Sequence, residues 1–117
     1  AFNQHGQNIP NYHFEALERV AELYKKRKLL NPAVLIDTNH ANSAKRYKQQ
    51  SRIALDVMKS RQQSDSIKNM VKGLMIESFL VEGNQKEDGT VYGQSITDPC
   101  LGWSDTETLV LRIGEFV

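Results

Sequence analysis

One histidine and two acidic residues stand where two short apolar segments of the chain give way to polar sequence. His40 follows residues 33–36, Glu77 directly follows residues 73–76, and Asp98 lies in the long polar stretch after them. An imidazole nitrogen and carboxylate oxygens form a ligand set for a divalent ion such as Mn, Fe, Co or Zn. These residue types therefore raise the hypothesis of a three-ligand metal site, although their spacing matches no short metal-binding motif.

Each of these residues also has an ordinary structural interpretation. A histidine that follows a strand is commonly a hydrogen-bonded loop residue, and a glutamate at a strand end commonly caps backbone groups or pairs with Lys or Arg. Asp98 precedes Pro99, which is typical of a turn. From the residues alone, the structural and the metal-binding interpretations both stay open.

Other reactive side chains have simpler explanations. Cys100 has no neighbouring motif of a nucleophile, so we expect a small buried residue. As the only cysteine it excludes an internal disulfide, which fits a reducing, cytoplasmic compartment. Trp103 is expected to anchor packing near a helix start. The four cations at residues 25–28 are expected to form a solvated helix end rather than a binding patch.

The charge balance argues against several classes of partner. Lys and Arg number 15 and Asp and Glu 14, so the formal net charge is +1. This gives no electrostatic case for binding nucleic acid or an anionic membrane. No run approaches the ~18 apolar residues of a membrane span. The first residues carry no secretory signal pattern, and the missing initial Met leads us to expect a trimmed or partial chain.

Periodicity predicts alternating helices and strands. Apolar residues at helical spacing predict helices over about 13–28 and 44–62, and a third helix from residue 104. Short apolar runs predict strands at 33–36 and 73–76. Residues 1–12 are expected to be a loop or a frayed end, and residues 64–66 a turn. Residues 79–103 are expected to be a long connection in which 90–92 form one arm of a hairpin.

Helix starts are predicted from capping residues. Asn11 would cap the first helix, and Asn42 or Ser43 the second. The run from Ser104 to Glu107 has the pattern of a capping box for the third. The second helix would bury one stripe of residues: Tyr47, Gln50, Ile53, Ala54, Val57 and Met58. The stripe of the third helix would be Leu109, Ile113 and Phe116.

The order of strand, helix and strand predicts a βαβ unit with parallel strands and a right-handed crossover. Two parallel strands leave both outer edges without a partner, and such edges promote association. We therefore expect the chain to belong to a larger sheet or to complete its sheet with another chain.

Three segments resemble signatures of the class I 3-deoxy-7-phosphoheptulonate (DAHP) synthases, the first enzymes of the shikimate pathway. The first is NPAVLIDTNHANS at residues 31–43. The second is GLMIES at 73–78 with VEGNQ at 81–85. The third is YGQSITD at 92–98 with Cys100, Gly102 and Trp103. They occur in the order and spacing of the family, and the resemblance extends from about Pro10 to the end.

The resemblance implies an α/β fold that is part of a (β/α)8 TIM barrel. Residues 1–117 would be a single C-terminal portion of the barrel, comprising the last two β/α units and the helix before them. A whole barrel needs about 250 residues, so the incomplete sheet expected above would be explained.

The resemblance also implies the site residues. His40, Glu77 and Asp98 would be ligands of a divalent metal (Mn, Fe, Co or Zn), and Asp98 could also contact the aldose substrate. The fourth ligand of the family, a cysteine on the first strand, is absent, and Cys100 matches a cysteine near the site that is not a ligand. His5 aligns with a phosphate-binding arginine of the family, so either that contact is weakened or residues 1–9 leave the family register.

The implied activity is that of a transferase, which condenses phosphoenolpyruvate with erythrose 4-phosphate and releases phosphate in aromatic amino acid biosynthesis. We expect a homo-oligomer. We expect the 117-residue chain alone to be inactive or nearly so, because it has three of the four metal ligands and the phosphate-binding residues of the family lie on absent strands. Two alternatives stay open. One is a non-catalytic barrel remnant that associates through its open sheet edges, and the other is an unrelated small α/β binding module.

Overall fold

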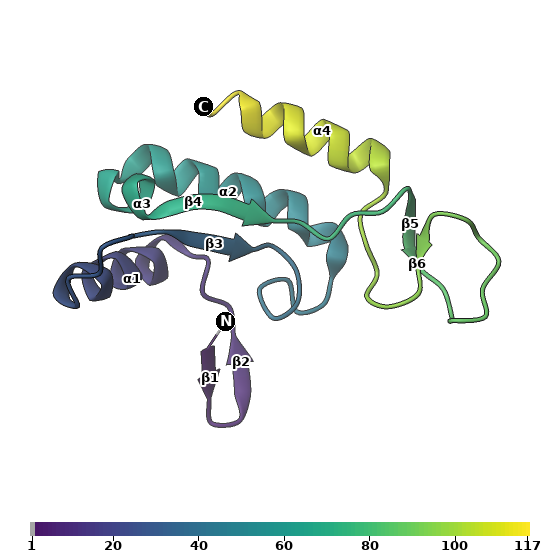
Figure 1. Cartoon of the computed structure of the whole chain (residues 1–117), viewed down its shortest axis with the longest axis horizontal. Helices are drawn as coiled ribbons and strands as arrows, with labels where there is room; N and C mark the ends of the chain where they lie inside the picture. The colour runs from purple at the N-terminus through teal and green to yellow at the C-terminus, as the bar shows by residue number, and fades with distance from the viewer. Residues whose placement is uncertain (1) are drawn as a thin grey trace.

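The computed structural model describes residues 2–117 of the chain, which form an elongated molecule with a sheet and helices at one end and a looped segment at the other (Figure 1). Two short elements precede the first strand of the central sheet: the hairpin of β1 (Phe2–Gln4) and β2 (Gln7–Ile9), and α1 (Phe14–Lys26). The central elements are β3 (Val34–Asp37), η1 (Tyr47–Gln49), α2 (Gln50–Gln63), α3 (Asp65–Met70) and β4 (Val71–Met75). The remaining elements are β5 (Val81–Asn84), β6 (Gln94–Ser95) and α4 (Trp103–Gly114).

The centre of the fold is a parallel pair of strands, β3 and β4, connected through α2 and α3. Leu35 pairs with Gly73 and Ile36 with Leu74, with an irregularity between Val34 and Leu35. The ends of both strands differ from the predicted ends by one or two residues, so the predicted βαβ unit is confirmed. The sheet of the described residues contains only these two strands, and both outer edges are open there.

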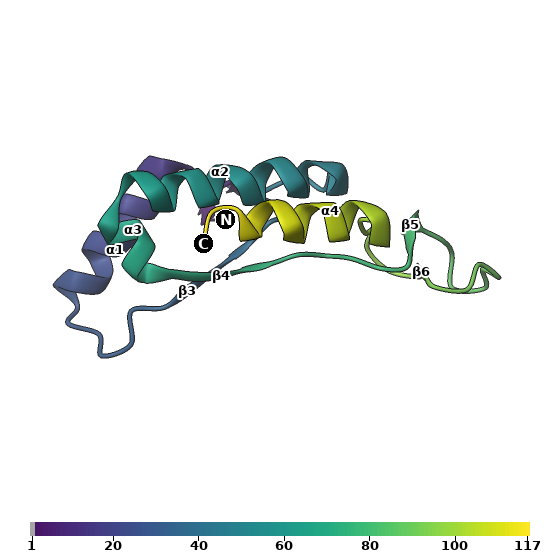
Figure 2. The same cartoon turned by 90° about the horizontal axis from the view of Figure 1, so that it is seen from above.

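The helices cover one side of this sheet, as Figure 2 shows for α2 and α4 beside β3 and β4. Alternate strand residues, such as Ile36, face the helices and join a buried core. Its other members come from the region before α1, from α1, α2 and α3, and from the start of β4: Tyr12, Leu17, Ile53, Val57, Ile67, Met70 and Val71. A second core lies between α2 and α4: Ala54, Leu55, Leu101 and Leu109.

The opposite side of the sheet is open to solvent. Leu35 is 69% exposed and Met75 is 47% exposed. Together with Gly73 these residues form what we call the open sheet face, because pairing and alternation place all three on the side away from the helices. A parallel sheet is normally covered on both faces, so this face is one that a larger assembly would bury.

The second helix begins later than predicted. We expected it from about residue 44 with Asn42 or Ser43 as its cap, but α2 begins at Gln50 after the short turn η1, and its N-cap Gln49 makes no side-chain capping bond. Ala44 and Lys45 have φ values of 51° and 59°. These left-handed conformations interrupt a right-handed helix, so the chain must first complete a tight turn.

The buried stripe predicted for this helix is largely confirmed. Gln50 and Ile53 are 0% exposed, and Val57 is also 0% exposed. Tyr47 is only partly buried and packs against the second core from η1. The stripe of the third helix is confirmed as well, since Leu109 is buried and its two predicted companions pack against the same core.

The N-terminal prediction of a loop or a frayed end is wrong for residues 2–9, and Ala1 lies outside the described residues. Asn3 pairs with Asn8 in an antiparallel hairpin whose turn contains His5 and Gly6 with positive φ. Paired positive φ values suit a two-residue hairpin turn. The predicted cap of α1 is also wrong, because the N-cap is His13, and the Asn11 N–H instead donates to Asn42 Oδ1 at 2.8 Å.

Three further local predictions need correction. The turn predicted at 64–66 is the start of α3, where Ser64 Oγ accepts a hydrogen bond from the Ile67 N–H. Residues 90–92 form no strand, and the connection instead contains β5 and β6, which pair in parallel. The predicted capping box is not formed, because α4 begins at Trp103 with Gly102 as its N-cap.

The structure is therefore a mixed α/β fold, as predicted. Within residues 2–117, no helix combines the length and the apolar character needed to cross a bilayer.

Candidate metal-binding site

The candidate site lies beyond the carboxyl ends of β3 and β4. His40 stands in a tight turn that follows β3, with φ of 48°, and its carbonyl accepts a hydrogen bond from the Lys45 N–H at 2.7 Å. Non-glycine residues with positive φ are uncommon and concentrate at functional sites. Ser43 Oγ donates to Asn39 Oδ1 at 2.8 Å within the same turn, which holds the strained backbone in place.

Asp37, the last residue of β3, orients the imidazole of His40. Its Oδ2 lies 2.7 Å from His40 Nδ1, and its Oδ1 accepts the Asn39 N–H at 2.8 Å. The contact leaves Nε2 as the nitrogen that faces away from Asp37. A carboxylate that accepts the other ring N–H is the usual partner of a metal-binding histidine, because it fixes the tautomer and raises the basicity of the ligand nitrogen.

The carboxylate of Asp37 also raises the pKa of His40 above 6.5, and Glu77 and Asp98 act in the same direction while desolvation opposes them. Because the pKa is raised in the folded state, protonated His40 stabilises the fold below about 6.5. This contribution is lost as the pH rises through the raised pKa.

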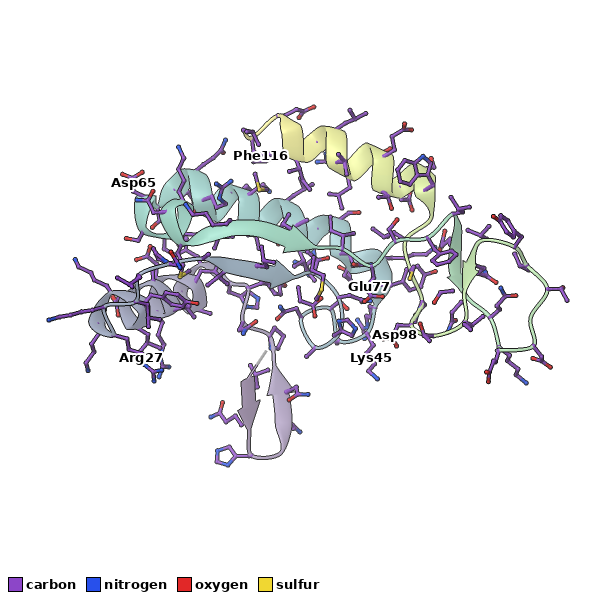
Figure 3. The ribbon with its side chains drawn as sticks, in the orientation of Figure 1. Arg27, Lys45, Asp65, Glu77, Asp98 and Phe116 are labelled. Carbon is purple, nitrogen blue, oxygen red and sulfur yellow. The ribbon has the colours of Figure 1, made fainter. Side chains whose placement is uncertain are left out.

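The two remaining predicted residues converge on His40 Nε2. Glu77 Oε1 lies 3.5 Å from this nitrogen, and Asp98 Oδ2 lies 3.3 Å from it. Glu77 follows β4, whereas Asp98 belongs to the connection between β6 and α4, so the three residues come from three separate segments. Figure 3 shows Glu77 and Asp98 beside the turn that carries Lys45.

The two distances to His40 Nε2 each fall in the range expected between two ligands of one ion. Metal–ligand bonds of about 2.0–2.2 Å at tetrahedral or octahedral angles separate ligand atoms by roughly 3.0–3.5 Å. The side chains of His40, Glu77 and Asp98 are 40%, 28% and 50% exposed, so an ion can reach them from solvent. As the side chains are placed within residues 2–117, however, no group of three or more His, Cys, Asp and Glu residues could hold a metal ion. In this structure the contacts are those of an ion-pair cluster.

Cys100 lies beside this cluster and contacts two of its residues. It is 5% exposed, its Sγ is 3.8 Å from Glu77 Oε2, and it donates to the Asp98 carbonyl at 3.3 Å. Burial raises the pKa of the Cys100 thiol, so the group stays protonated and is a poor nucleophile. The expectation of a small buried residue is confirmed.

Two other expectations have different outcomes. Trp103 is 56% exposed at the start of α4, so the prediction that it anchors packing is wrong. The cations from Lys25 to Lys28 are exposed at the end of α1, which confirms a solvated helix end. His5 is also exposed, at the tip of the N-terminal hairpin that projects away from the central sheet (Figure 1).

Sequence reasoning missed two residues that position this cluster. Asp37 stands three residues before His40, and this spacing across a turn was the available signal. Gln50 appeared only as one member of a buried stripe. Its side chain accepts the Glu77 N–H at 2.8 Å and donates to the Glu77 carbonyl at 2.9 Å, which no local pattern indicates.

The chain is similar to known proteins over nearly its whole length. Residues 4–111 match the model of the DAHP synthetase I family. The phospho-2-dehydro-3-deoxyheptonate aldolase of Haemophilus influenzae is 41% identical over 116 residues, which cover 96% of this chain and 31% of that protein. The Phe-sensitive phospho-2-dehydro-3-deoxyheptonate aldolase of Escherichia coli is 42% identical over 116 residues, covering 96% of this chain and 32% of that protein.

A solved structure has the same fold over the matched region. The phospho-2-dehydro-3-deoxyheptonate aldolase of Francisella tularensis superposes with a TM-score of 0.83 at 32% sequence identity, covering 93% of this chain and 31% of that chain. The chain thus spans about a third of the length of the curated relatives it matches. Since the family model covers all but a few residues at each end, the chain belongs to the DAHP synthetase I family.

Proposed function

We propose that this chain forms the last two β/α units, and the helix before them, of a (β/α)8 barrel that condenses phosphoenolpyruvate with erythrose 4-phosphate. The product would be 3-deoxy-D-arabino-heptulosonate 7-phosphate plus phosphate. The relatives named above carry this activity in their names, and the open sheet face is what a barrel portion would expose. Active sites of such barrels lie at the carboxyl ends of the strands, where His40, Glu77 and Asp98 meet.

The single observation that carries the proposal is the approach of both carboxylates to His40 Nε2, at 3.5 and 3.3 Å. This donor set fits a divalent cation, because neutral imidazole and ionised carboxylates are its ordinary ligands. A bound cation would supply Lewis-acid polarisation of the aldehyde of the sugar phosphate. His40 would hold it through Nε2 while Asp37 keeps the ring oriented, and Glu77 and Asp98 would neutralise its charge.

Asp98 has the further role of a substrate contact in this proposal. Its side chain is 50% exposed, the most of the three, and it lies on a loop rather than on a strand end. A hydroxyl group of the aldose can therefore reach its carboxylate while the other oxygen holds the cation.

The test is metal binding by the purified chain. We expect Co²⁺ to bind the wild-type chain and to give visible absorption bands, and His40→Ala to weaken this binding by more than the about 10–100-fold that loss of an outer-shell partner costs. His13→Ala is the matched control, because His13 is exposed at the start of α1 and stacks on Tyr12. Equal Co²⁺ affinity in all three proteins would contradict the proposed site.

An activity assay completes the test. The isolated chain should release no phosphate from phosphoenolpyruvate in the presence of erythrose 4-phosphate, because the rest of the barrel is required. Turnover by the 117-residue chain alone would contradict this part of the proposal.

A second candidate function is a non-catalytic barrel remnant that associates with copies of itself. The observation that favours it is the exposure of Leu35 and Met75 on a sheet whose outer edges are both open within the described residues. Exposed apolar faces and unpaired edges drive association. A stable oligomer that binds no metal would favour this candidate over the first.

A further inference from the structure

Gln50 is a polar residue in a place where most helices bury an apolar one. It is the first residue of α2 and is 0% exposed, between the helix and the ends of β3 and β4. A buried amide group is tolerated only when its donor and acceptor find partners. The identity of those partners therefore indicates what the residue does.

Both ends of the Gln50 amide are bound to the same residue of the neighbouring segment. Its Oε1 accepts the Glu77 N–H at 2.8 Å, and its Nε2 donates to the Glu77 carbonyl at 2.9 Å. In a sheet, an adjacent strand binds the N–H and carbonyl of one residue in this paired manner. Gln50 thus supplies from a side chain the pairing that Glu77 would otherwise receive from a strand.

This double contact sets the direction in which the Glu77 side chain leaves the backbone. The N–H belongs to the peptide group before Glu77 and the carbonyl to the peptide group after it. Holding both peptide planes fixes the two backbone dihedrals of the residue, and with them the Cα–Cβ bond that carries the carboxylate. The Glu77 carbonyl also accepts the Leu101 N–H at 3.0 Å, which holds the same peptide from another segment.

Gln50 also connects Glu77 to the segment that carries His40. Its Oε1 accepts a second hydrogen bond, from Thr38 Oγ1 at 3.0 Å, and Thr38 Oγ1 lies 2.9 Å from the Met75 carbonyl. Thr38 is 0% exposed and directly follows β3. One buried amide therefore joins the ends of both strands. It binds Thr38 after β3, two residues before His40, and it binds Glu77 after β4.

We propose that Gln50 is a positioning residue of the metal site, which fixes the backbone of Glu77 so that its carboxylate faces His40 Nε2. The metal-binding part of this inference rests on the proposed function, whereas the positioning of Glu77 does not. Outer-shell partners of metal ligands are commonly worth about 10–100-fold in metal affinity.

The main test replaces Gln50 with methionine, which has a similar length and shape but can neither donate nor accept these bonds. We expect Gln50→Met to weaken Co²⁺ binding by about 10–100-fold. Val57→Ala is the matched control, because Val57 is equally buried in α2, two turns further on, and belongs to the apolar core. It should lower the thermal stability while leaving the Co²⁺ affinity of the folded chain within twofold of wild type.

A second variant covers the case in which Gln50→Met does not fold. Gln50→Asn keeps a buried amide but is one methylene shorter, so it cannot bind both backbone groups of Glu77. The same weakening of Co²⁺ binding is expected. If either folded variant binds Co²⁺ as tightly as wild type while His40→Ala does not, the inference about Gln50 is overturned and the proposed site stands.

A metal-free measurement decides the inference if the wild-type chain binds no Co²⁺. The Glu77 amide proton should exchange with solvent at least tenfold faster in Gln50→Met than in wild type, relative to the Lys68 amide, which donates to the Ser64 carbonyl at 2.9 Å in α3. An unchanged ratio of the two exchange rates would overturn the inference. A raised ratio would support the positioning role even though the proposed metal site had failed.

Discussion

At the scale of single residues, His40 is held from one side so that its other nitrogen is presented to two carboxylates. Asp37 binds Nδ1 at 2.7 Å, and Glu77 and Asp98 approach Nε2. The arrangement works only if Nδ1 carries the ring proton, since Nε2 must offer a lone pair to a cation. Asp37 therefore controls both the orientation and the tautomer of the imidazole.

We expect Asp37→Asn to disturb this control without removing the side chain's bulk. The neutral amide should lower the pKa of His40, because the contact with Asp37 is the main cause of its raised value. The amide NH2 group favours the tautomer with the proton on Nε2, so Co²⁺ affinity should fall about 10–100-fold. NMR titration of the His40 ring and a Co²⁺ titration measure the two effects.

Asp56→Asn is the control for this prediction. Asp56 pairs with Arg52 at 2.8 Å on the surface of α2 and has no contact with the cluster. Loss of the Asp56 charge should leave both the His40 titration and Co²⁺ binding unchanged. An unshifted His40 titration in Asp37→Asn would show that the carboxylate does not control this imidazole.

At the scale of elements, a hydrogen-bonded clasp joins the turn before α2 to β5. Glu82 Oε1 accepts the Tyr47 hydroxyl at 2.7 Å and lies 2.6 Å from Lys48 Nζ. The Glu82 carbonyl also accepts the Gln94 side-chain amide at 2.7 Å, which ties β5 to β6. This clasp helps to place the connection that carries Asp98 beside the ends of β3 and β4.

We expect this clasp to open in acid. Lys48, and after it Tyr47, hold the pKa of Glu82 below its ordinary 4.5. Because the pKa is lowered by folding, the contact stabilises the fold fully above about 4.5 and is lost as the pH falls through the lower folded value. The NMR shift of the Glu82 side-chain carbonyl should follow a midpoint below 4.5.

Two lysine substitutions check the cause of this shift. Lys48→Met should move the midpoint of Glu82 back towards 4.5, because the hydrogen bond from Lys48 is the main cause of the lowered pKa. Lys59→Met should leave it unchanged, since Lys59 lies on α2 near Asp56. If the Glu82 midpoint is the same in Lys48→Met and in wild type, the contact with Lys48 is not the cause of the lowered pKa.

At the scale of the whole molecule, the helices cover one side of the sheet and leave the other bare (Figure 2). The open sheet face of Leu35, Gly73 and Met75 adjoins the side chain of Asp37, which pairs with Met75. The same unburied surface is therefore continuous with the candidate site. Whatever completes the sheet would also enclose the cluster and shield its charges from water.

We expect the isolated chain to self-associate through this face. Leu35→Lys should shift the chain towards monomer in analytical ultracentrifugation, because it places a charge on the exposed apolar surface. Leu35 is 69% exposed, so the substitution should destabilise the fold little. Leu30→Lys is the matched control, since Leu30 is 95% exposed in the connection between α1 and β3. Equal sedimentation of both variants and wild type would argue against association through this face.

Hydrophobic periodicity was sufficient to predict the central βαβ unit. Runs such as residues 33–36 and 73–76 are strands because they are apolar on both sides, and the stripe of α2 follows the helical period. Local turn chemistry misled the prediction elsewhere. Asn42 could cap a helix, but its amide instead donates to the Asp37 carbonyl at 2.8 Å and closes the turn of His40.

The candidate cluster divides in the same way between local and long-range causes. The sequence determined that His40 and Glu77 follow parallel strands, and the strand ends of a parallel pair lie at one edge. The family resemblance had placed Asp98 in the same ligand set, but only the tertiary structure showed that it reaches this nitrogen and that Gln50 holds Glu77, because these contacts join segments far apart in the chain. Side-chain periodicity records which residues are buried, whereas the partner of a buried polar group depends on how separate elements pack together.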